Sequence, residues 1–83
     1  MWVAGLELSS ALAVELAKRL FGEGMFKVAE RILEADATGA DHVSLTIRER
    51  EAILWTLADG PDELAPLRTV LVNQLDWRRR ESL

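Results

Sequence analysis

The stretch 45–61 constrains this chain most, because it carries the signals for both ends of one helix. Thr46 followed three residues later by Glu49 predicts a capping box, in which each side chain accepts a hydrogen bond from the other residue's backbone N–H. Gly60 suits a left-handed residue just beyond the helix, and Pro61 cannot continue it. A central helix with defined ends leaves room for a helical pair before it and one long helix after it.

Apolar periodicity places the remaining helices. Leucines recur at four-residue steps after Ser9 or Ser10, either of which is a suitable N-cap. A short glycine-containing link then favours an antiparallel helical hairpin. We expect four helices, at about 9–21, 25–37, 46–58 and 62–80. The sequence thus predicts an all-α fold, a small four-helix bundle whose last helix is the longest.

The whole of 1–83 is expected to be a single domain, as its length suggests. Residues 1–8 are apolar and open to two interpretations, a backward extension of the first helix or an extended arm lying on a neighbour. Pro66 fits a helix only in its first turn, so regular helix in the last segment is expected to begin near Ala65.

The helix faces give the expected core. The central helix should bury Ile47, Leu54, Leu57 and Ala58, with Ile53 at the margin, while Arg48-Glu49-Arg50-Glu51 should be mostly solvated. The last helix should bury Leu64, Leu67, Leu71 and Leu75. Trp55 and a strip formed by Val70 and Trp77 fall outside these faces.

Composition limits how so small a chain can be stabilised. It has no cysteine and one histidine, His42, which excludes disulfides and makes a metal site implausible, so no cofactor is expected. It nevertheless carries 14 Leu, 6 Val, 3 Ile, 3 Trp, 2 Phe and 2 Met. A domain of this size has too much surface to bury all of them, which favours a partner that covers the remainder.

Charge and hydropathy narrow the class of partner. The net charge of −4 weighs against a general nucleic-acid binder. No apolar run is long enough to span a bilayer, and residues 1–7 lack the basic and apolar regions of a signal peptide. We therefore expect a cytoplasmic protein with no membrane role and no evident small-molecule substrate.

Three segments, Leu45–Glu51, Leu57–Gly60 and Glu63–Ala65, together resemble the opening of a LuxR-type helix-turn-helix domain. The resemblance covers about 20 of the 83 residues and implies a DNA-binding regulator. The family continues with a turn and a polar recognition helix. Residues 66–77 instead have the pattern of one apolar-faced helix without a turn.

The functional prediction is a non-catalytic protein–protein interaction module that self-associates, as a dimer, or binds a protein partner through its helix faces. Its alternative is the helix-turn-helix regulator. No catalytic residues are expected, because a bundle this small shows no nucleophile, orienting group and cleft together. The candidate interface residues are Trp2, Trp55, Val70 and Trp77, since tryptophan is enriched at binding hot spots. The candidate contact for an anionic partner is formed by Arg78, Arg79 and Arg80. Three arginines at a helix C-terminus also interact favourably with the negative end of the helix dipole.

Overall fold

The computed structural model describes the backbone of residues 1–82 and the side chains of residues 1–75. It is mostly helical, as predicted, but also contains a small three-stranded sheet, so the all-α prediction was incomplete. The helices are α1 (Ser10–Gly22), α2 (Phe26–Thr38), α3 (Ile47–Thr56) and α4 (Ala65–Ser82), with a single 3₁₀ turn, η1 (Asp62–Leu64), before α4. The strands are β1 (Trp2–Val3), β2 (Leu6–Glu7) and β3 (His42–Val43).

The sheet accounts for the ambiguous N-terminal segment. β1 and β2 form an antiparallel hairpin, and β1 also pairs in parallel with β3, which gives the order β2-β1-β3. The turn between β1 and β2 places Ala4 and Gly5 at φ values of 52° and 84°, as a tight two-residue hairpin requires. Val3 faces inward and is fully buried. The segment is therefore neither a helix extension nor an arm on a neighbour, because it pairs within its own chain.

Local signals correctly predicted the helix starts. The Ser9 side chain accepts a hydrogen bond from the backbone N–H of Leu12, 3.2 Å away, and caps α1. The capping box of α3 is confirmed, with 3.1 Å from the Glu49 backbone nitrogen to Thr46 Oγ1 and 2.8 Å from the Thr46 backbone nitrogen to Glu49 Oε1. The 3₁₀ turn precedes regular helix at Ala65, as the position of Pro66 predicted.

Leucines, isoleucines and valines from all four helices and from the hairpin make one core. Its largest fully buried side chains are Leu16, Leu20, Ile32, Ile53, Leu57, Leu64, Leu67, Leu71 and Val3. Leu75, expected in the core, is only partly buried.

The predicted core face of the central helix was wrong by part of a turn. Ile53, expected at the margin, is fully buried, whereas Ala58 is exposed. α3 ends at Thr56, so Ala58 lies beyond the helix and no longer follows its periodicity. The face is centred on Ile53 and Leu57 instead.

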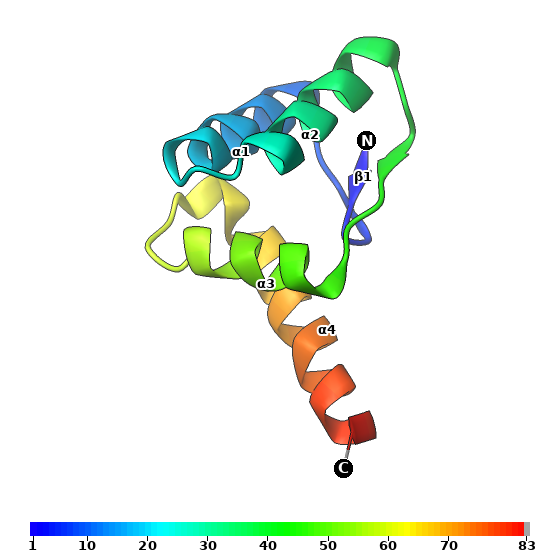
Figure 1. Ribbon diagram of the computed structural model, residues 1–83, viewed down its shortest axis with the longest axis vertical. Coiled ribbons are helices and arrows are strands. Elements are labelled where there is room, and N and C mark those ends of the chain that lie inside the picture. The colour runs from blue at the N-terminus through cyan, green and yellow to red at the C-terminus, as the bar shows by residue number, and fades with distance from the viewer. Residues whose placement is uncertain (83) are drawn as a thin grey trace.

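The helices do not form a regular four-helix bundle (Figure 1). α1 and α2 lie side by side as the expected hairpin, α3 passes beneath them, and α4 leaves the base of the molecule, so that its C-terminal turns extend beyond the other helices. Within the described part of the chain, no helix is both long enough and apolar enough to cross a bilayer. α3 and α4 contact one another, and α4 is the helix that projects.

Candidate interaction site between α3 and α4

A shallow apolar groove lies along the junction of α3 and α4. It has a volume of about 320 Å³. We call it the Trp55 groove and define it by its lining residues, Leu54, Trp55, Ala58, Arg68 and Val72. Four of these five side chains are apolar, so the groove suits an apolar or aromatic side chain better than a polar ligand.

Trp55 is the most exposed large hydrophobic residue among the described side chains, at 77%. It follows Ile53 and precedes Leu57 by two residues, which places it about 200° around α3 from each of these buried residues. Val72 on α4 is also exposed, at 40%. The indole therefore stands on the outer face of α3 and is not required by the core.

Arg68 fixes one edge of the groove. Its Nη1 donates to the carbonyl oxygen of Leu57 at 2.9 Å and to that of Ala58 at 3.4 Å. Leu57 is the C-cap of α3 and Ala58 follows it, so these carbonyls accept no hydrogen bond from the helix backbone, and a cation near them also interacts favourably with the helix dipole. The guanidinium of this α4 residue is thus held by the backbone that directly follows α3.

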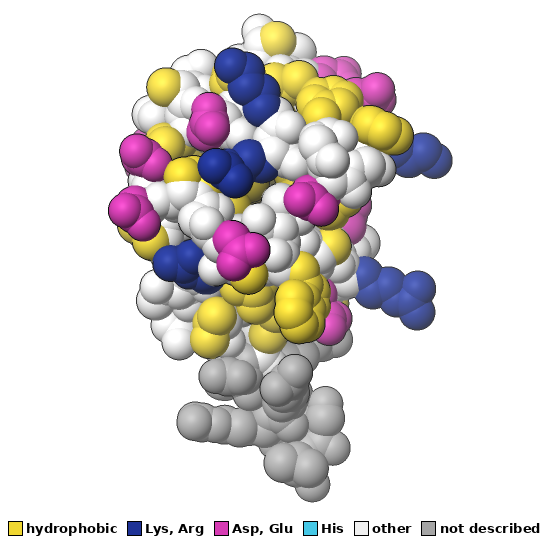
Figure 2. Space-filling view, turned by 90° about the vertical axis from the view of Figure 1, so that its left-hand side faces the viewer, with side chains coloured by type: hydrophobic (Ala, Val, Ile, Leu, Met, Phe, Trp, Pro, Cys, Tyr) yellow, Lys and Arg dark blue, Asp and Glu magenta, His cyan; other side chains and the backbone are white. Residues whose placement is uncertain are grey.

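Figure 2 shows hydrophobic side chains gathered low on one face of the described part of the molecule. Val72 lies three residues before Leu75, the last residue whose side chain the structure describes. On α4 the Trp55 groove therefore reaches Val72, which lies within the described side chains.

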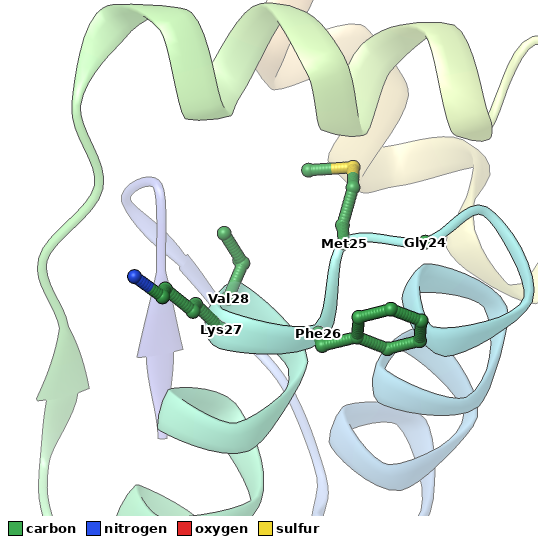
Figure 3. A pocket seen from close by; sticks show the side chains of 5 residues that line it. All are labelled: Gly24, Met25, Phe26, Lys27 and Val28. Atoms are coloured by element: carbon green, nitrogen blue, oxygen red, sulfur yellow. The ribbon is translucent and has the colours of Figure 1, made fainter.

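A second depression, of about 370 Å³, lies where α2 begins. It is lined by the consecutive residues Gly24, Met25, Phe26, Lys27 and Val28. In Figure 3 the Met25 side chain points toward α3 and the Phe26 ring points toward α1. Phe26 is 56% exposed and its ring centroid is 6.0 Å from that of Phe21. Because the lining comes from a single turn, this depression is a weaker candidate than a groove shared by two helices.

The strongest electrostatic contact lies elsewhere and is structural. Arg31 on α2 forms an ion pair with the Glu49 carboxylate and also donates from Nη1 to the Ser44 carbonyl oxygen at 3.3 Å. The hydrogen bond from Arg31 lowers the pKa of Glu49, and the backbone N–H of Thr46 lowers it further. The prediction that this part of α3 is mostly solvated was therefore wrong for Glu49, which is half-buried and joins α2 to the start of α3.

The predicted interface residues are not gathered at one place. Trp55 lines the groove, whereas Trp2 is 48% exposed on the outer side of the sheet, in register with Glu7 and His42. Val70 is half-buried and does not line the groove. The side chains of Trp77, Arg78, Arg79 and Arg80 lie outside the described residues.

Sequence reasoning missed most of the groove. It assigned Leu54 and Ala58 to the core and gave no role to Arg68 or Val72. A usable signal was present, because each of these pairs is spaced i,i+4 and so lies on one side of its helix. What the sequence lacked was the crossing of α3 and α4, which brings the two pairs together.

Of the three segments that resemble a LuxR-type domain, the first contains the start of α3, the second lies in the turn after α3, and the third spans the end of η1 and the start of α4. The chain then continues as one helix from Ala65 to Ser82, with Leu67 and Leu71 fully buried. The departure from the family pattern noted in the sequence is therefore present in the structure, since no turn separates a recognition helix within α4. In the described residues, no three His, Cys, Asp or Glu side chains are grouped to hold a metal ion.

Comparisons of the chain with models of protein families, with curated proteins and with solved structures give no match. The groove and its residues therefore carry the functional interpretation by themselves.

Proposed function

We propose that this protein is a non-catalytic interaction module that self-associates through the Trp55 groove. The observation that carries the proposal is the position of Trp55, a large indole 77% exposed beside a groove with mostly apolar walls. Exposing an indole to water is unfavourable by about 25 cal/mol for each Å² of apolar area, so a surface that covers it gains that free energy. Tryptophan is also among the residues most enriched at binding hot spots.

The small size of the patch favours a weak association. Five lining residues make a contact area at the low end for protein interfaces, where complexes are weak and transient. We therefore expect a dimer with a dissociation constant on the order of 10–100 µM. Such a module would respond to its own concentration over that range. The cytoplasmic location and the single-domain organisation remain predictions from the sequence.

The test is the solution mass over a concentration series, from about 5 µM to about 500 µM, by sedimentation velocity or light scattering. A mass that rises toward twice the monomer mass supports the proposal. Trp55→Ala should keep the protein monomeric over this range. Trp2→Ala is the matched control, because Trp2 is also partly exposed but lies on the sheet. A wild-type protein that stays monomeric throughout would overturn self-association.

DNA binding remains the alternative prediction. Retention on DNA that weakens as salt rises would favour it, because displaced phosphate counterions make such binding salt-dependent. The same protein samples can be used for this measurement. Salt-sensitive retention together with a monomeric mass would replace the interaction module by a nucleic-acid binder.

A further inference from the structure

Sulfur chemistry in this chain is confined to two residues, because it has no cysteine and its only methionines are Met1 and Met25. We infer that Met25 is a redox-sensitive modification site. A peroxide converts its thioether to a sulfoxide, and the new oxygen accepts a hydrogen bond from the Thr56 hydroxyl. That bond joins the start of α2 to the end of α3. Neither residue lines the Trp55 groove, and the site does not depend on the proposed self-association.

Met25 lies where a small oxidant reaches it. It directly precedes α2 as its N-cap, it is only partly buried, and it lines the depression of about 370 Å³ at the start of that helix. This volume far exceeds the space that one water molecule needs, and hydrogen peroxide is little larger than water. Figure 3 shows the Met25 side chain beside this opening, directed toward α3. A methionine within reach of a peroxide is a common site of oxidation.

The Thr56 hydroxyl lies at a distance from the Met25 sulfur that one bonded oxygen atom would fill. Thr56 Oγ1 is 3.8 Å from the sulfur, and it donates to the Ala52 carbonyl oxygen at 3.0 Å. A thioether sulfur is a weak acceptor, so it competes poorly for the hydroxyl proton. An oxygen bonded to the sulfur at about 1.5 Å, with an angle of about 120° at that oxygen, would lie about 2.8 Å from Thr56 Oγ1, a usual length for an O–H···O hydrogen bond. The sulfoxide therefore gains a partner without a movement of either helix.

The reaction needs hydrogen peroxide and no other reactant. The Met25 sulfur attacks one peroxide oxygen, so that the S–O bond forms as the O–O bond breaks. The proton on the transferred oxygen passes to the departing hydroxide, which leaves as water. Sulfur is oxidised by one electron pair and the peroxide is reduced by the same pair. The product is a polar group on a side chain that packs against the apolar core, where it is costly unless it is hydrogen-bonded. The Thr56 hydroxyl supplies that bond.

The fold should therefore tolerate the sulfoxide better while residue 56 keeps its hydroxyl. Wild type and Thr56→Val are each compared before and after treatment with hydrogen peroxide, since valine has the shape of threonine but no donor. Oxidation should lower the thermal unfolding midpoint of Thr56→Val by about 4–8 °C more than that of wild type, the shift expected for one hydrogen bond in a domain of this size. Because each protein is its own reference, the effect of the substitution on the unoxidised fold cancels.

Matched variants isolate the contact. Met25→Leu keeps Met1, so its response to peroxide measures oxidation elsewhere in the chain. Thr56→Ser keeps the hydroxyl and should behave as wild type. Thr56→Ala is a second variant without it, in case valine alters the end of α3, and circular dichroism verifies that each variant is folded. Peptide mass spectrometry reports the extent of oxidation at each methionine, and methionine sulfoxide reductases should restore each midpoint. Low protein concentration keeps any dimer out of the comparison.

Oxidation of Met25 in the folded protein, with an extra loss in Thr56→Val that Thr56→Ser does not show, supports the site. If the peroxide oxidises free methionine but leaves Met25 intact, the inference is overturned. If oxidation lowers the midpoints of wild type and Thr56→Val equally, the Thr56 hydroxyl does not bind the new oxygen and the inference is likewise overturned. The oligomeric state decides neither result, so a failure of the proposed self-association would leave this site standing.

Discussion

The Gln74 side-chain amide donates to the carbonyl oxygen of Ala4 across 2.6 Å, which joins α4 to the turn of the N-terminal hairpin. These two residues are 70 positions apart in the chain. The contact closes the domain, because the hairpin in turn pairs with β3 between α2 and α3. A bond this distant in sequence is invisible to any local pattern.

Gln74→Ala should therefore destabilise the fold. It removes the donor for the Ala4 carbonyl, which costs about 1 kcal/mol of the free energy of unfolding. The net loss is limited, because the substitution also removes the buried Oε1 of Gln74, which has no hydrogen-bond partner among the described residues. Urea unfolding measures the change. Asn73→Ala, on the adjacent exposed position of α4, is the control and should not lower the midpoint, because alanine favours a helix more than asparagine does.

Glu49 should make the stability of the fold depend on pH. Its pKa in the folded protein is lowered, first by the hydrogen bond from Arg31, so folding favours the carboxylate. The stability that the charged Glu49 side chain contributes is fully present above its pKa in the unfolded chain, about 4.3 for a glutamate. It is lost as the pH falls through the lower pKa of the folded protein.

The measurement compares wild type with Glu49→Gln. Near pH 7 the wild type should be more stable by about 1 kcal/mol, since the variant loses the charged partner of the capping box and of Arg31. This difference should shrink below about pH 4. Glu51→Gln, at an exposed position two residues further along α3, serves as the control. A difference that is the same at pH 7 and at low pH would contradict the role of the Glu49 charge.

Two glycines at helix C-termini should respond to alanine in opposite directions. Gly39 caps α2 at a φ of 72°, a left-handed conformation that costs an L-residue about 1–2 kcal/mol. Gly22 ends α1 without a positive φ, where alanine is favoured by up to about 1 kcal/mol. A Cβ at either position meets no atom within 4 Å, so packing does not interfere.

Gly39→Ala should therefore lower the thermal unfolding midpoint and Gly22→Ala should raise it. Differential scanning calorimetry of the two variants, side by side, measures both signs. Equal shifts in the same direction would show that backbone conformation does not decide these positions.

Alanine substitutions at Leu57 and at Trp55 should distinguish an effect on the stability of the fold from an effect on association. Leu57→Ala removes a side chain that is 1% exposed and should destabilise the fold by about 2–5 kcal/mol. Trp55→Ala removes one that is 77% exposed and should change the stability of the monomer by less than about 0.5 kcal/mol. Unfolding measured at low protein concentration avoids the contribution of any dimer. A large loss of monomer stability in Trp55→Ala would mean that the indole packs on its own chain.

Signals that act over a few residues were predictable. Thr46 and Glu49 are three positions apart, Ser9 acts on Leu12, and Pro66 limits where regular helix begins. Each depends on backbone groups of the same turn, so the sequence contains both partners. The exposure of Trp55 was predictable in the same way, because helical periodicity places it on the opposite side of α3 from the buried Ile53 and Leu57.

The sheet was not predictable in this way. Its strands have two residues each, too short for an alternating pattern, and β1 pairs with β3 some 40 positions along the chain. The ion pair of Arg31 with Glu49 likewise depends on α2 passing the start of α3.

The sequence by itself determined the helices, most of their ends and the excess of apolar side chains, because these follow from local hydrogen bonding, periodicity and composition. Only the tertiary structure decided that the N-terminal segment forms a hairpin and that Leu54, Ala58, Arg68 and Val72 line one groove together with Trp55. The physical reason is that a groove is a property of two elements and of the angle at which they meet. That angle is set by how the whole core packs, and no single stretch of sequence contains it.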